Sequence, residues 1–180
     1  MTRPIIAAMV GLVLLGTRGW AAEEPRPLDD RTRCIVVFKE VLAYVKCRDL
    51  KAVFGKIMDG GGKGAFRLSP TDDVAKLLRA MGEEQDEGKF LEKSFPHAEA
   101  ILAHFDDIKF SDLQRQAGTV RVSTKGGGPK GEGELFVIQI VIPENAGVDL
   151  QKTDSDGLKL FSRLRFVKYG GRIYWVPFGW

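Results

Sequence analysis

The hydrophobic period of this 180-residue chain changes once, at about Asp107, and this change constrains the fold more than any other feature. Before that point apolar residues recur at steps of three and four, which is typical of helices with one buried face. After it apolar and polar residues alternate, which is typical of strands. Helices first and antiparallel strands afterwards predict an α+β domain, in which the helices pack on one face of a sheet.

The helical part of the pattern consists of several pieces separated by polar turns. A long helix and a shorter one are expected over residues 31–58, with a sharp turn at residues 46–49, where Asp49 can cap the second helix. The block ends at the glycines of residues 60–62, because glycine continues a helix only at a cost. Three further helical pieces are expected, which begin at Ser69, Phe90 and Pro96.

The period of two after residue 107 predicts five strands. They are expected at residues 108–113, 119–124, 134–142, 158–169 and 172–178. Gly170 and Gly171 form a turn that is typical of a β-hairpin between the last two strands. The strand at residues 134–142 is apolar on both faces, which indicates that both faces are covered or that one of them faces a cavity.

An apolar run of eleven residues, 5–15, follows Arg3 near the start of the chain. A bilayer core needs about 20 apolar residues, so this run is short for a membrane span. A basic start, a short apolar run and small residues around Ala21 are typical of a secretory signal peptide. We therefore expect a signal peptide at residues 1–22, a flexible leader at 23–30 and a single domain at 31–180. The domain would be exported, to a bacterial periplasm or as a secreted protein; an uncleaved anchor helix is the alternative.

The charge balance of the chain is close to neutral. The full sequence has 27 Lys and Arg against 24 Asp and Glu, and loss of Arg3 and Arg18 with the signal peptide leaves 25 against 24. Nucleic-acid binders carry a marked excess of positive charge. The balance therefore argues against a nucleic-acid partner.

Two segments resemble parts of a known family. Residues 37–50 (VFKEVLAYVKCRDL) combine a long helix, a turn containing Asp and a short apolar helix. Residues 166–176 (FVKYGGRIYWV) combine a strand, a glycine turn and an aromatic last strand. Together they resemble the nuclear transport factor 2-like fold, which ketosteroid isomerases share. The resemblance implies a cone in which N-terminal helices pack on a curved antiparallel sheet. The family includes isomerases, dehydratases and non-catalytic binding modules, so the resemblance does not decide function.

Four side chains are candidates for binding a ligand or a partner: Tyr44, Gln139, Tyr174 and Trp175. Gln139 is an amide on an apolar strand, and such a group can orient a ligand in a pocket; a cross-strand or solvent contact is the simpler explanation. Tyr174 and Trp175 point to opposite faces of the last strand, so one face is expected to close the core and the other to carry a partner or ligand patch. No residue of this sequence is assigned a catalytic role.

The sequence predicts neither a metal site nor a cofactor. His97 and His104 lie two helical turns apart, about 10 Å along the axis, which is too far to share a metal ion. The glycine-rich stretches at residues 59–64 and 125–131 lack the Lys-Ser or Lys-Thr pair of a phosphate-binding loop. The first stretch is expected to end the preceding helix, and the second is expected to be a mobile hairpin loop.

The two cysteines, Cys34 and Cys47, leave a disulfide open, because an exported chain meets oxidising conditions. On one straight helix, thirteen steps of 1.5 Å separate them by about 20 Å, which is beyond the reach of a disulfide. A bridge requires Cys34 to lie outside the helix. Two reduced thiols are the alternative.

These observations support two hypotheses of function. The first is an exported, non-catalytic module that binds a small apolar molecule or a protein partner. The second is an isomerase- or cyclase-like enzyme with an acid–base pair in the cone. A carboxylate or tyrosine at the bottom of the cavity favours the enzyme, and a filling of apolar side chains favours the binding module. A homodimer formed through the sheet is a further alternative.

Overall fold

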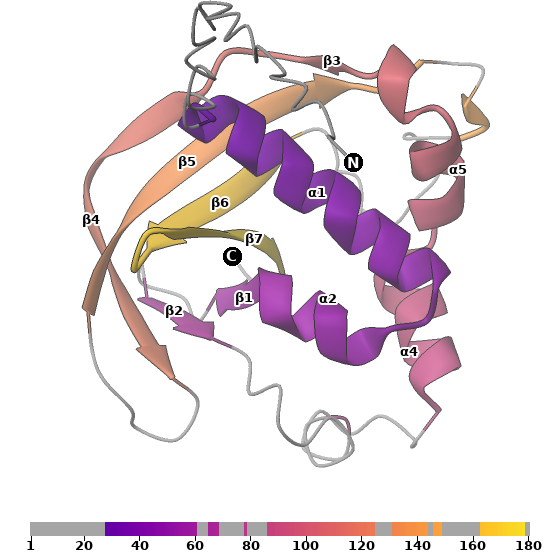
Figure 1. Ribbon diagram of the computed structural model, residues 1–180, viewed down its shortest axis with the longest axis horizontal. Coiled ribbons are helices and arrows are strands. Elements are labelled where there is room, and N and C mark those ends of the chain that lie inside the picture. The colour runs from indigo at the N-terminus through magenta and orange to yellow at the C-terminus, as the bar shows by residue number, and fades with distance from the viewer. Residues whose placement is uncertain are drawn as a thin grey trace, which may run out of the picture.

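Helices form in the first part of the chain and most strands in the second, so the predicted α+β class is confirmed. The computed structural model describes residues 28–60, 65–68, 78, 86–124, 131–143, 146–148 and 163–178. In Figure 1, α1 and α2 lie across one side of the sheet, and α4 and α5 lie beside the C-terminal end of α1. The expected signal peptide lies outside the described residues.

The first two helices each begin at an aspartate. The side chain of Asp29 accepts a hydrogen bond from the first turn of α1 (Asp30–Lys46). After a sharp turn, the side chain of Asp49 does the same for α2 (Leu50–Lys56), which confirms the predicted cap. The two helices therefore start where local sequence directs them to start.

Shorter helices follow after a gap in the described residues. They are α4 (Glu87–Ser94), α5 (Ala98–Ala103) and the 3-10 helix η1 (Phe105–Asp107). The first two match the pieces expected at Phe90 and Pro96. The helix expected from Ser69 lies outside the described residues except for Leu78, which is helical and buried.

The strands of the second half lie close to their expected ranges. They are β3 (Lys109–Phe110), β4 (Gln114–Thr124), β5 (Gly131–Val141), β6 (Arg163–Tyr169) and β7 (Arg172–Phe178). The start of the strand expected at residues 158–169 lies outside the described residues. Gly170 and Gly171 both have positive φ, 55° and 73°, as a tight hairpin turn requires.

Two strands form where the pattern predicts none. β1 (Ile57–Gly60) covers the expected end of a helix and the start of the glycine-rich stretch, and β2 (Ala65–Leu68) directly follows that stretch. The prediction of helix as far as Met58 is wrong, because Ile57 and Met58 are buried in two different cores, on opposite faces of β1. A short apolar run fits a buried strand as well as a helix, so the period alone does not separate the two.

The strands close into a ring. Around it the order is β5, β4, β2, β1, β7 and β6, and β6 pairs with β5 again, while β3 pairs with the far end of β5. The prediction of an entirely antiparallel sheet is wrong, because β1 pairs with β7 and β2 with β4 in parallel. These parallel pairs arise because β1 and β2 come from the helical half of the chain and insert between β4 and β7.

Two apolar cores lie on the two sides of this ring. On the outer side, Phe38 and Leu42 of α1 and Phe54 of α2 join a cluster with Phe166 and Trp175 of the sheet. On the inner side, every strand of the ring supplies one buried side chain: Met58, Phe66, Val122, Leu135, Val167 and Val176. Small closed sheets are commonly filled in this way.

Gly133 of β5 allows the close packing inside the ring. A Cβ at this position would lie 2.9 Å from the backbone oxygen of Lys168 and 2.9 Å from Cγ1 of Val167. We expect Gly133→Ala to lower the free energy of unfolding by about 1–3 kcal/mol, the usual cost of overpacking a core. Urea denaturation measures this change. Thr119→Ala, at an exposed position of β4, is the control and should stay within about 0.5 kcal/mol of the parent. Equal stability of Gly133→Ala and the parent would contradict the packing.

Candidate functional site

The described strands fill the inside of the ring with apolar side chains. Among the residues that the structure describes, no polar or charged residue is buried to the level of the core. An acid–base enzyme working inside a cone needs a buried carboxylate or tyrosine within reach of a second polar group. The described part of the ring interior supplies apolar groups instead, so a functional site is to be sought at the periphery.

Trp175 lies in the outer core and is 1% exposed. The centroid of its ring lies 5.1 Å from that of Phe38 and 5.8 Å from that of Phe95. Its indole N–H finds no hydrogen-bond partner among the described residues. Trp175 is therefore the residue of the Tyr174–Trp175 pair that closes the core, and it does not form a surface patch.

The other three candidate residues lie in different places. Tyr174 is half-buried, packs against the inner core and borders a hollow beside α1 and α2. Tyr44 is half-buried against the outer core. Gln139 is exposed, and its backbone pairs with Ser111: its N–H donates to Ser111 Oγ at 3.0 Å, and its carbonyl oxygen accepts from Ser111 N–H at 2.9 Å. The structure therefore does not bring the four candidates together into one site.

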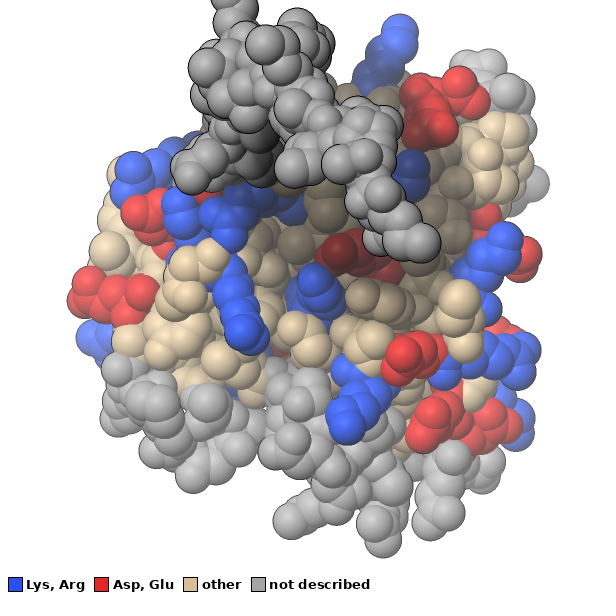
Figure 2. Space-filling model, viewed as in Figure 1, with Lys and Arg blue, Asp and Glu red and all other residues tan. Residues whose placement is uncertain are grey.

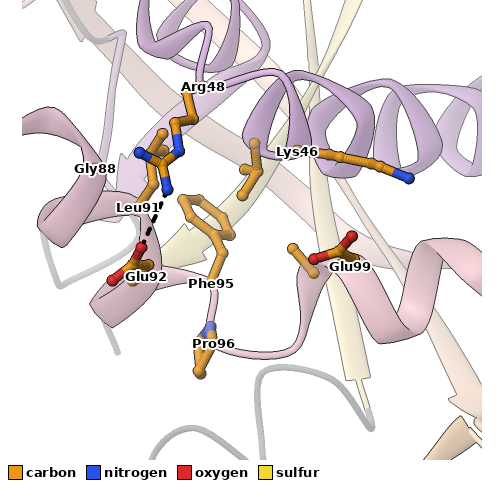
Figure 3. Close-up of a pocket in the computed structure, with 10 residues that line it drawn as sticks. Lys46, Arg48, Gly88, Leu91, Glu92, Phe95, Pro96 and Glu99 are labelled. Carbon is orange, nitrogen blue, oxygen red and sulfur yellow. Dashed lines mark hydrogen bonds and ion pairs between the residues drawn. The ribbon is translucent and has the colours of Figure 1, made fainter.

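A pocket with an apolar floor lies where the end of α1 meets α4 and α5, and we call it the helix pocket (Figure 3). Its volume is about 330 Å³. The residues that line it are Val45, Lys46, Arg48, Gly88, Leu91, Glu92, Phe95, Pro96, Ala98 and Glu99. Ligand sites commonly have this composition, with an apolar floor and a few charged groups at the rim.

Arg48 stands at this pocket in an unusual backbone conformation. Its φ is +57°, and among the described residues other than glycine it alone has a positive φ. The N–H groups of Arg48 and Asp49 donate to the carbonyl oxygens of Val45 and Tyr44, which is the Schellman ending of a helix. Glycine usually fills this position, because an L side chain there costs about 1–2 kcal/mol. The chain thus keeps an arginine where a glycine would be more stable.

The rim of the helix pocket carries charges of both signs. Arg48 Nη2 lies 3.4 Å from Glu92 Oε1, and both side chains are largely exposed. In Figure 3, Phe95 lies between this ion pair on one side and Glu99 on the other. Lys46 and Arg48 carry positive charge at this rim, and Glu92 of α4 and Glu99 of α5 carry negative charge. Because these charges balance, an uncharged or zwitterionic molecule fits the rim better than a strong anion.

A second hollow, of about 280 Å³, lies between α1, α2 and the start of β7, and we call it the cationic groove. Arg33, Lys56 and Arg172 border it, together with Tyr174.

Sequence reasoning missed all of the charged residues of both hollows. The turn at residues 46–49 was a visible signal for Arg48, but its partners come from segments far away in the chain.

The cysteines are both reduced, so the disulfide left open by the sequence does not form. Cys34 lies inside α1 and Cys47 directly follows it, and a straight helix holds them too far apart. Cys34 is buried and Cys47 exposed. Burial raises the pKa of the Cys34 thiol to about 12, and the neighbouring Asp30 carboxylate acts in the same direction.

Neither the other features of the described residues nor a comparison with known proteins identifies a function. Within the described ranges, no three His, Cys, Asp or Glu residues lie close enough together to hold a metal ion. No helix in this part of the chain is both long and apolar enough to cross a membrane. Protein-family models, curated proteins and solved structures contain no match to the chain.

The two thiols should differ sharply in reactivity, because the thiolate is the reactive form. At pH 8 we expect Ellman's reagent to label Cys47 within minutes and Cys34 only after denaturation. Cys47→Ser should abolish the fast phase. Because the pKa of Cys34 is raised in the folded chain, its contribution to stability is complete below pH 9 and is lost as the pH rises to about 12. Absence of any fast-reacting thiol in the parent would contradict the reduced state of Cys47.

Substitutions of Arg48 separate its backbone cost from its side-chain role. We expect Arg48→Gly to be about 1 kcal/mol more stable than Arg48→Ala, because only glycine adopts a positive φ without strain. Thermal unfolding followed by circular dichroism measures the difference. Equal stabilities of the two variants would show that residue 48 is not held in the left-handed region.

Proposed function

We propose that this chain is an exported, non-catalytic binding module whose helix pocket holds the apolar part of a small molecule. The observation that carries the proposal is the apolar floor of that pocket. The described part of the ring interior, by contrast, is filled with apolar side chains. Export rests on the pattern of residues 1–22. The nuclear transport factor 2-like cone and its family remain a proposal that rests on residues 37–50 and 166–176.

The floor of the helix pocket is suited to an apolar group. Leu91, Phe95 and Ala98 line the pocket and are each at most 3% exposed, so they are fixed in place and offer a ligand a narrow apolar strip. The volume of about 330 Å³ is at the small end of ligand sites, which span about 300–1,000 Å³. This volume favours one ring system of a ligand, or a short alkyl chain, as the part that enters the pocket.

A small molecule suits this site better than a protein partner does. A stable protein interface buries about 800 Å² on each partner and contains a contiguous apolar centre. The large apolar residues exposed in the described part of the chain, Leu28, Val36 and Val141, come from separate elements. Single exposed apolar residues of this kind are ordinary on soluble domains.

The enzyme hypothesis has less support from the same residues. An acid–base mechanism requires a titratable group held in an apolar environment near a second polar group. The thiol of Cys34 is such a buried titratable group, but its pKa of about 12 keeps it protonated and unreactive at neutral pH. Binding without catalysis is therefore the function that the described residues support best.

An uncharged fluorescent probe tests the proposal. N-phenyl-1-naphthylamine brightens in apolar sites and carries no charge that would draw it to the cationic groove. We expect saturable binding to the purified chain, with NMR shifts at the backbone amides of Val45, Leu91 and Phe95. In Glu92→Trp, the indole should cover the apolar floor and weaken probe binding at least tenfold, because burying an aromatic side chain contributes more than about 1.4 kcal/mol.

Asp112→Trp provides the matched control, since Asp112 is an exposed carboxylate between β3 and β4, away from the helix pocket. It should bind the probe as the parent does. Probe binding that both variants weaken equally, or shifts confined to other elements, would overturn the assignment of the helix pocket.

A further inference from the structure

The cationic groove collects positive charge from three separate elements. Arg33 comes from α1, Lys56 ends α2 and Arg172 begins β7. Figure 2 shows Lys and Arg side chains on this face, over the region between α1, α2 and the β6–β7 hairpin. These residues lie far apart in the sequence, so the fold rather than a local basic run creates the cluster.

Two of these cations are held in place by contacts. Arg33 Nη2 donates to the carbonyl oxygen of Gly171 at 2.5 Å, and Arg33 Nη1 lies 3.2 Å from Asp30 Oδ1. Lys56 Nζ lies 2.6 Å from Glu40 Oε2. The side chains in both ion pairs are about one-third exposed, so their charged ends are fixed while still reachable from the groove. Such preorganisation lowers the entropy lost on binding.

The carboxylates do not balance the cations. Asp30 is shared between Arg33 and Lys168, whose Nζ lies 2.7 Å from Asp30 Oδ2. Arg172 is exposed and forms no ion pair with any of the described residues. Asp29 belongs to the same neighbourhood, so the described cluster contains four cations and three carboxylates and keeps an excess of one positive charge, with the guanidinium of Arg172 outside the ion pairs. A guanidinium binds carboxylate or phosphate oxygens through two parallel hydrogen bonds.

An apolar wall lies beside this charge. Val37 and Ile173 are buried and border the groove, and Tyr174 is half-buried along it. Arg172 and Tyr174 are two residues apart on β7, so their side chains leave the strand on the same face. Both residues border the groove, and Tyr174 also packs against the inner core. The groove therefore places an anion-binding group beside the edge of an aromatic residue, which matches a small molecule with an acidic group and an apolar body.

We infer that the cationic groove binds a small organic anion, a carboxylate or phosphate monoester with an aromatic or alkyl group. Arg172 contacts the acidic group, Arg33 and Lys56 add their charge, and Tyr174 with its neighbours packs against the apolar part. This site is separate from the helix pocket and does not depend on the function proposed there.

Phenyl phosphate is the probe that tests this site, with inorganic phosphate as the anion alone and benzyl alcohol as the apolar part alone. We expect saturable NMR shifts at Arg33, Val37 and residues 172–174 with phenyl phosphate, weaker binding of inorganic phosphate and none of benzyl alcohol. Affinity should fall as salt is raised, because the interaction is between charges. Equal affinity for phenyl phosphate and inorganic phosphate would overturn the role of the apolar wall.

Arg172→Gln should weaken phenyl phosphate binding about tenfold or more, as loss of a charge-assisted hydrogen-bonding group does. Arg121→Gln removes the same charge from an exposed arginine of another strand, β4, and should bind as the parent does. Well-dispersed spectra of both variants establish that they are folded. Equal weakening in both variants, or no saturable shift in the groove of the parent, would overturn the inference. Unchanged shifts at Leu91 and Phe95 during the titration keep this result distinct from the test of the helix pocket.

Discussion

Closure of the sheet depends on the parallel pairing of β1 with β7, and the rest of the structure depends on that closure. The register places Ile57 beside Trp175 and Asp59 beside Phe178. β1 and β2 together bring Met58 and Phe66 into the ring, where four other strands each add one apolar side chain. Without β1 and β2, the other four side chains of the inner core would lose Met58 and Phe66 as packing partners and be exposed to water. Exposure of apolar surface costs a free energy of about 25 cal/mol for each Å². The same strand carries Ile57 into the outer core, so β1 joins both cores.

The filled ring determines where function can lie. In the described part of the ring the interior is packed with apolar side chains, so the charged residues of the two hollows lie where helices end against the sheet or against each other. The helix pocket lies at one such junction and the cationic groove at another. Their charges differ for a physical reason. The helix pocket borders two cations and two carboxylates, of which Arg48 and Glu92 form an ion pair. Around the groove, the described carboxylates Asp29, Asp30 and Glu40 lie among four cations, the fourth being Lys168 behind the groove.

Caps and turns were predicted correctly because they depend on neighbouring residues. Contacts between distant segments of the chain could not be predicted from the sequence. The cap at Asp49, the turn at Gly170 and Gly171, and the opposite faces of Tyr174 and Trp175 all follow from neighbouring residues, and all are found. β1 and β2 are four residues each, which is too short for a period to identify. The charged pairs of the candidate sites join residues far apart in the chain, such as Arg48 with Glu92, which are 44 positions apart. Their meeting depends on tertiary packing and has no sequence pattern of its own.

α1 supplies residues to both hollows, one near each of its ends. Arg33 lies in its first turn and borders the cationic groove, while Val45 and Lys46 lie in its last turn and border the helix pocket. A helix of 17 residues is about 25 Å long, so the two sites are too far apart for one small molecule to fill both. The buried face of α1, including Phe38 and Val41, is fixed against the sheet between them. Since a packed helix moves as a rigid body, a ligand that tilted one end of α1 would have to break contacts in the outer core. The two sites are therefore expected to bind independently.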